Sequence, residues 1–280
     1  MLDSCRMAQA RQAEACSKAL WRSWPVALPL FFAVSSLWAR VTHADPAAPT
    51  WCAPELQALT EGVCALTNQE SRPDTLVIFL HGVIKPDTGW QQQQQRAIAR
   101  AARANGFDVM MPRGRRGVGP KGMQDWWTWP TGVAAQQKVE PEILEEWSAA
   151  RTELETRRGT PYPRVLVFGF SNGAYYATQL ALRGKSPGQG TAVFAGGASG
   201  DWLERHAKAA QPRVPLYVEC GSRDKTAVGD AHRLHRMLQR LGWAHRFVER
   251  KGSGHSMPDA GVENAFEYLS RTVTLPAVAH

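Results

Sequence analysis

The stretch RVLVFGFSNGAYYATQLALR, residues 164–183, decides how the chain is expected to fold. Residues 164–170 form a short apolar run rich in branched and aromatic side chains, which predicts a buried strand. Residues 172–183 are helical in character. Ser171 stands between them, in the sequence Gly-Phe-Ser-Asn-Gly. A serine on a sharp turn between a strand and a helix is the arrangement of a nucleophile elbow.

Strand-like and helix-like segments alternate on both sides of this stretch. We expect six strands, over residues 75–80, 107–111, 164–170, 191–195, 214–220 and 245–249. We expect helices over residues 91–105, 142–158, 172–183, 230–241 and 262–271. Apolar strands separated by amphipathic helices predict a mostly parallel sheet that is covered on both faces. The expected fold class is therefore α/β, a single doubly wound sheet without a large cap domain.

Ser171 is the candidate nucleophile. Glycine at positions 169 and 173 leaves room for the strand and the helix to approach each other at the turn. The backbone N–H of Asn172 can then face an oxyanion at the helix N-terminus. A serine hydroxyl needs a base to remove its proton, and in this architecture the base is a histidine late in the chain.

His255 fits that position, because it lies in the glycine-rich segment KGSGHSMP (residues 251–258) directly after the sixth expected strand. Asp224, in CGSRDKTAV (residues 220–228), follows the fifth strand and is the candidate partner that orients the imidazole. Asp201 after the fourth strand is its competitor. The alternatives are an ordinary surface histidine at 255 and a turn aspartate at 224 that pairs with a neighbouring basic residue.

The segment LHGV, residues 80–83, ends the first expected strand. A tight glycine turn here would present the N–H of Val83 as a second oxyanion donor opposite Asn172. His81 is then interpreted as a structural residue of the turn. Four loops that each follow a strand, in the order that a hydrolase needs, are a far more specific signal than any one of these motifs.

Together, LHG, GFSNGA, GSRDKTAV and GSGHS resemble the α/β-hydrolase superfamily. The resemblance is to its compact branch of carboxylesterases, dienelactone hydrolases and polyhydroxyalkanoate depolymerases, and it runs from about residue 76 to residue 269. It implies acyl transfer to water through an acyl-enzyme, without a cofactor. Few or short strands precede LHG, so we expect a sheet smaller than the family's eight strands.

The segment QDWWTWP, residues 124–130, places Trp126, Trp127 and Trp129 in a long loop after the second expected strand. The three rings are candidates for an acyl or aromatic pocket. Packing of the loop onto the body is an equal alternative. Basic residues in the same loop are candidates for attracting a carboxylate, although exposed loop charge explains them equally well (Arg113, Arg115, Arg116 and Lys121).

Residues 1–44 have the pattern of a secretory signal peptide, with basic residues up to position 22 and an apolar run over 25–39. We therefore expect a hydrolase domain over 45–280 and export to the periplasm or the medium, without a membrane span once the leader is removed. An uncleaved membrane anchor is the alternative. Cys52 and Cys64 are expected to form a local disulfide, and Cys220 to be a small buried apolar residue.

The remaining composition narrows the function. Without residues 1–44 the chain has 28 basic and 23 acidic residues and no basic stripe interleaved with aromatic residues. Nucleic-acid binding is therefore not expected, and no histidine or cysteine spacing predicts a metal site or a cofactor. We expect a serine hydrolase of small or polymeric carboxylic esters. A peptidase for short peptides and a non-catalytic binding protein on the same scaffold are the alternatives.

Overall fold

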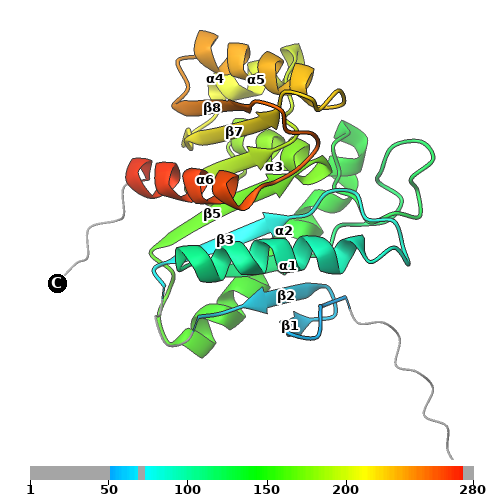
Figure 1. Ribbon diagram of the computed structural model, residues 1–280, viewed down its shortest axis with the longest axis vertical. Coiled ribbons are helices and arrows are strands. Elements are labelled where there is room, and N and C mark those ends of the chain that lie inside the picture. Colours follow the sequence, from blue (N-terminus) through cyan, green and yellow to red (C-terminus); the bar gives the residue numbers. More distant parts are fainter. Residues whose placement is uncertain (1–50, 69–72, 274–280) are drawn as a thin grey trace, which may run out of the picture. The chain divides into compact units, whose positions relative to one another are not determined.

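The structure is a computed structural model in which residues 51–68 and 73–273 are described (Figure 1). The expected leader, residues 1–44, lies outside the described residues. Among the described residues, no helix has both the length and the apolar composition needed to cross a bilayer.

An eight-stranded sheet forms the centre of the fold, in the order β1-β2-β4-β3-β5-β6-β7-β8. β2 pairs antiparallel with both β1 and β4, and all other neighbouring strands are parallel. The strands are β1 (Gln57–Thr60), β2 (Val63–Leu66), β3 (Thr75–Leu80), β4 (Asp108–Pro112), β5 (Arg164–Phe170), β6 (Gly190–Phe194), β7 (Leu216–Gly221) and β8 (His245–Arg250).

Helices cover both faces of this sheet, and each face has its own apolar core. α1 and α6 contribute the helical residues of one core, and α2, α3, α4 and α5 those of the other. Figure 1 shows α1 and α6 together in front of the strands. The helices are α1 (Trp90–Asn105), α2 (Val133–Arg158), α3 (Asn172–Leu182), α4 (Asp201–Ala209), α5 (Val228–Arg240) and α6 (Asp259–Thr272).

The expected fold class is confirmed: one mostly parallel, doubly wound sheet, without a large cap among the described elements. The expected number of strands is wrong. β1 and β2 have four residues each, which is too short for a periodic apolar pattern to reveal them. α4 was also not expected, since its nine residues have only two buried side chains, Leu203 and Ala207.

α2 is longer than expected, because it begins at Val133 and continues through Pro141. A proline usually marks the first turn of a helix, since it lacks an N–H and crowds the preceding turn. Tertiary contacts hold the turns before it. Gln136 donates a hydrogen bond to the Pro130 carbonyl (3.1 Å), and buried Glu140 binds the guanidinium of Arg183.

The segment before β1 is held to the body near the start of α1. The expected Cys52–Cys64 disulfide is present, with 5.4 Å between the Cα atoms. Gln95 of α1 donates a hydrogen bond to the Trp51 carbonyl (3.0 Å) and accepts one from the Ala53 N–H (2.9 Å). Cys220 is reduced and buried, as expected.

Candidate active site

The turn between β5 and α3 has the geometry that the sequence predicts. Ser171 has φ 52° and ψ −118°, a strained conformation for a residue with a side chain. A Cβ on Gly169 would come within 2.4 Å of the Gly173 carbonyl oxygen, and one on Gly173 within 2.1 Å of that of Leu80. Both positions therefore need glycine, because strand and helix approach each other closely to expose the serine.

Three loops at the carboxyl edge of the sheet bring the predicted side chains together. His255 Nε2 lies 2.8 Å from Ser171 Oγ, and His255 Nδ1 lies 2.8 Å from Asp224 Oδ2. A carboxylate only accepts hydrogen bonds, so Nδ1 carries the proton and Nε2 is free to accept the serine hydroxyl. The Phe170 ring packs against the imidazole, with 5.2 Å between the centroids.

Asp224 is almost completely buried and remains ionised. Burial alone would raise the pKa of this carboxyl, but hydrogen bonds from Thr226 and His255 outweigh it and lower the pKa. The Thr226 hydroxyl and N–H donate to Oδ1 at 2.6 and 3.1 Å, and the Ala227 N–H donates at 3.2 Å. Asp201, the competing candidate, is an exposed residue at the start of α4.

The loop after β3 is fixed by hydrogen bonds on both sides of Gly82. The Gly82 N–H donates to Gln94 Oε1 (2.7 Å), and the Gly82 carbonyl accepts a hydrogen bond from His81 Nδ1 (2.5 Å). His81 Nε2 accepts from the Gly114 N–H (2.9 Å), which places the proton on Nδ1. The C=O and N–H of a trans peptide point in opposite directions, so His81 sets the direction of the Val83 N–H.

His81 is a structural residue of this turn, as the sequence analysis interpreted it. Its side chain is buried, and burial lowers its pKa to about 4, so it stays neutral near pH 7. Among the described residues, no backbone hydrogen bond from the N–H of Val83 is found, and none from that of Asn172 to a residue outside α3. Asn172 is the first residue of α3, where a helix offers no acceptor for its N–H.

A cavity of about 460 Å³ opens beside Ser171 and His255. Val83 and Gly82 line one side of it, and Ser256 and Met257 lie beside His255. The first turns of α1 complete the lining with a mixture of apolar and amide side chains (Trp90, Gln93, Gln94 and Ala97).

None of the three predicted pocket tryptophans lines this cavity. Trp129 is fully buried, stacks on Tyr176 and donates its indole N–H to the His81 carbonyl (2.8 Å). Trp127 lies under two arginine side chains, and Trp126 makes a T-shaped contact with Trp90. For these rings the structure favours loop packing, because a loop of this length needs apolar anchors. Trp90 takes the position at the cavity.

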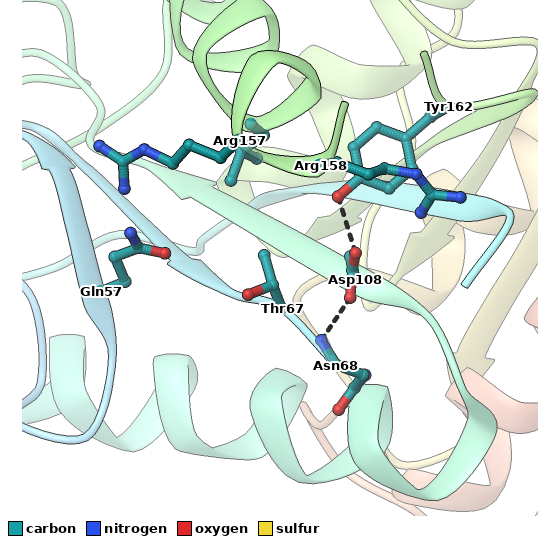
Figure 2. A pocket seen from close by; sticks show the side chains of 8 residues that line it. Gln57, Thr67, Asn68, Asp108, Arg157, Arg158 and Tyr162 are labelled. Carbon is teal, nitrogen blue, oxygen red and sulfur yellow. Dashed lines mark hydrogen bonds between the residues drawn. The ribbon is translucent and has the colours of Figure 1, made fainter. Parts of the chain in front are cut away.

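A second cavity, of about 290 Å³, lies at the opposite, amino edge of the parallel strands (Figure 2). Asp108, the first residue of β4, accepts hydrogen bonds from the Tyr162 hydroxyl (2.7 Å) and the Asn68 N–H (2.6 Å). Figure 2 shows these partners converging on the carboxylate from two sides, with Arg157 and Arg158 nearby. Both carboxylate oxygens of Asp108 therefore have protein partners.

Sequence reasoning missed Gln94, Thr226 and Trp90. The run QQQQQ at residues 91–95 was interpreted only as part of a helix, although its fourth and fifth members make specific buried contacts. Thr226 stood in the GSRDKTAV motif, and its distance of two residues from Asp224 was an available signal. Among the described residues, no group of three or more histidine, cysteine or acidic side chains has the arrangement of a metal site.

The sheet order, the elbow and the loop positions define an α/β-hydrolase. Residues 62–273 match the model of the phospholipase/carboxylesterase family, and the chain belongs to that family. It is an esterase-type hydrolase. Similar solved structures include esterase PE8, which is 21% identical, covers 75% of this chain and 97% of its own, and has a TM-score of 0.54.

Two further structures show the same fold. SOBER1 of Arabidopsis thaliana is 15% identical over 71% of this chain and 99% of its own, with a TM-score of 0.52. The Bacillus cereus carboxylesterase is 14% identical, covers 78% of this chain and 95% of its own, and has a TM-score of 0.51. Among curated proteins, acyl-protein thioesterase 1 of Eremothecium gossypii is 27% identical over 141 residues, 49% of this chain. The match spans only 57% of that relative's length.

The expectation of export is wrong. The match to an acyl-protein thioesterase points away from an exported enzyme. The expectation rested on composition, since basic residues followed by an apolar run of 15 residues have the pattern of a leader. Such a pattern describes the segment's polarity and does not establish that it is recognised for export.

Proposed function

We propose that the chain hydrolyses carboxylic esters through an acyl-enzyme formed on Ser171, with His255 as general base and Asp224 as the residue that orients it. The observation that carries this proposal is the continuous pair of 2.8 Å contacts from Asp224 Oδ2 through the imidazole to Ser171 Oγ. The family match supports the reaction class.

In the first half of the reaction, Ser171 Oγ attacks the ester carbonyl carbon while its proton passes to His255 Nε2. The charge that develops on the carbonyl oxygen is stabilised by the N–H groups of Val83 and Asn172. The tetrahedral intermediate then expels the alcohol, which takes the proton from His255. The products of this half are the free alcohol and the acyl ester of Ser171.

In the second half, water enters the position that the alcohol has left. His255 Nε2 takes a proton from this water, and the resulting hydroxide attacks the acyl carbon. The same two N–H groups stabilise the second intermediate, which returns the proton through His255 to Ser171 Oγ and releases the acid. Asp224 remains a carboxylate throughout and stabilises the imidazolium that forms in each half.

Thioester hydrolysis is a second candidate, favoured by the match to an acyl-protein thioesterase. A thioester forms the same acyl-enzyme and differs only in its leaving group, a thiol in place of an alcohol. The cavity beside Ser171 accepts either, since its lining is apolar and amide in character.

The test is labelling of the purified full-length protein with a fluorophosphonate, followed by assays of p-nitrophenyl esters, acyl thioesters and peptide anilides. Labelling that Ser171→Ala abolishes, together with ester turnover, is the expected result. A preference for the thioester identifies a thioesterase, and a preference for anilides a peptidase. A folded protein that is neither labelled nor active is a binding protein on this scaffold and contradicts the proposal.

A further inference from the structure

Two guanidinium groups and two indole rings form a cluster one loop away from the candidate active site. The Cζ atoms of Arg113 and Arg116 lie 4.5 and 4.4 Å from the Trp127 ring centroid. Trp51 meets Trp127 edge-on, with 5.9 Å between centroids, and Arg113 also lies over Trp51, at 5.8 Å. We call these four residues the arginine–tryptophan cluster.

Among the described residues the positive charge of the cluster is offset only at a distance, by Glu146 and Glu61 near Arg113. Neither Arg113 nor Arg116 has a carboxylate within 4.0 Å in that part of the chain, whereas neighbouring Arg115 pairs with Glu146. Arg113 Nε is buried and has no hydrogen-bond partner among the described residues. Burial, followed by the charge of Arg115, lowers the pKa of Arg113 and outweighs the opposite effect of Glu146 and Glu61. Holding the partly buried guanidinium of Arg113 near the exposed one of Arg116 has a free-energy cost that an anion would offset.

A cavity of about 260 Å³ opens onto the cluster and can hold such an anion. Both arginines and both tryptophans line it. Its other charged lining residues are Lys85 and Asp87, so cations outnumber carboxylates by three to one. The combination of guanidinium donors with flat aromatic surfaces suits a molecule that has an anionic oxygen group attached to an apolar part.

The cluster cavity borders the same loop as the Ser171 cavity. Val83 lines the Ser171 cavity, and the next residue, Ile84, lines the cluster cavity. Ile84 and Trp127 exchange two backbone hydrogen bonds, of 3.0 and 2.9 Å, which fix the cluster against this loop. At the start of α1, Gln92 lines the cluster cavity and Gln93 lines the Ser171 cavity.

We propose that the arginine–tryptophan cluster is a binding site for an organic anion, a carboxylate or a phosphate that carries an apolar group. The anion lies between Arg113 and Arg116, and its apolar part lies against the tryptophan rings. The anion is either a remote part of the ester substrate or a separate molecule. The first case rests on the proposed function, and the second does not.

Direct binding tests the site without hydrolysis. Full-length protein with Ser171→Ala is titrated with phenyl phosphate, and with benzyl alcohol as the uncharged counterpart, while tryptophan fluorescence is followed. We expect saturable binding of phenyl phosphate only. Because a charge-assisted hydrogen bond at a partly exposed site is lost, Arg116→Gln weakens this binding about five- to tenfold. Absence of saturable binding, or equal affinity in the Arg116→Gln protein, overturns the proposal.

Matched variants separate binding from general charge and from stability. Arg205→Gln removes an exposed arginine from α4 and is expected to leave phenyl phosphate affinity unchanged. Arg113→Gln, at the half-buried arginine of the cluster, weakens affinity at least as much as Arg116→Gln. If Arg113→Gln lowers the melting temperature and leaves affinity unchanged, its guanidinium is a structural contact only, which overturns the site as proposed.

A kinetic arm identifies the source of the anion. Wild type and Arg116→Gln are compared on two p-nitrophenyl esters, one with a terminal carboxylate and the other with the corresponding amide. A fall in kcat/KM for the carboxylate ester alone shows that the anion belongs to the substrate. Equal turnover of both esters, with weaker phenyl phosphate binding, shows a separate molecule. Absence of any Ser171-dependent turnover contradicts the proposed function and leaves the binding result standing.

Discussion

Two buried carboxylates at opposite edges of the sheet show what separates the proposed catalytic site from a structural one. Asp224, after β7, and Asp108, at the start of β4, are 2% and 4% exposed and both accept short hydrogen bonds. Asp224 is followed by an imidazole and then by a serine hydroxyl. Asp108 is followed by the phenol of Tyr162, beside which lies the guanidinium of Arg158.

The difference lies in the partner and not in the carboxylate. Burial, followed by the hydrogen bond to Asp108, raises the pKa of Tyr162, so that its proton is held at any physiological pH. An imidazole has two nitrogens and can accept a proton at one while the other remains bound to the carboxylate. Burial of an acid is therefore a poor signal of function until its partner is known.

Removal of the serine hydroxyl is expected to have the largest effect. Ser171→Ala should lower kcat by about five to six orders of magnitude, because among the described residues only the Ser171 hydroxyl is hydrogen-bonded to His255 Nε2. Ester hydrolysis with active-site titration measures it. The melting temperature should change little, since alanine keeps the same Cβ on the same strained turn. A Ser171→Ala protein that retains a tenth of the activity would place the reaction elsewhere.

Replacing each carboxylate by an amide tests the comparison directly. Asp224→Asn should lower kcat about 10⁴-fold, because an amide favours the wrong imidazole tautomer. Asp108→Asn should leave kcat unchanged and lower the free energy of unfolding by about 1–3 kcal/mol, since the partners of a buried acceptor are left poorly bonded. Assays and urea denaturation of both variants give the two values. Similar losses of kcat in Asp224→Asn and Asp108→Asn would contradict the difference proposed between the two carboxylates.

His81 lies at the carboxyl edge of the sheet, beside the candidate active site. Its titration is nevertheless expected to affect the stability of the fold as the pH falls. Its pKa is about 4 in the folded protein and about 6.5 when exposed, so the unfolded chain binds more protons between these values. The contribution of neutral His81 to the free energy of unfolding is complete above pH 6.5. About 3 kcal/mol of it is lost as the pH falls toward 4. Urea denaturation across this range should show less pH dependence in His81→Asn than in wild type. Identical slopes would contradict a buried neutral His81.

Substitutions at two neighbouring glutamines, Gln94 and Gln95, are expected to have the smallest effects. One should change kcat and the other the melting temperature. Gln94→Leu should lower kcat about tenfold with little change in KM, because Gly82 and the Val83 donor lose their support. Gln94→Glu keeps an acceptor for the Gly82 N–H and should retain most of the activity. Gln95→Leu should instead lower the melting temperature and leave kcat per folded molecule unchanged, since Gln95 binds Trp51 and Ala53. A loss of kcat in Gln95→Leu alone would reverse these roles.

Much of the fold and the centre of the candidate site could be predicted from the sequence. The apolar strands β3, β5 and β7 are recognisable because a strand buried on both faces needs branched side chains throughout. Parallel strands end at one edge, so the loops that carry Ser171, Asp224 and His255 had to lie close together once the fold class was known. Glycine at 169 and 173 revealed the turn, since a side chain there would collide with backbone.

The tertiary structure alone decided which side chains surround that centre. The four-residue strand β2 pairs with the edge of β4, and β1 pairs in turn with β2. α2 extends back to Val133 because Arg183 and Pro130 hold its first turns. The cavity is lined by Trp90 and not by the predicted tryptophans, whose positions depend on what they pack against. Such contacts join residues far apart in the chain, so no local pattern specifies them, whereas periodicity and turn chemistry are local and can be predicted.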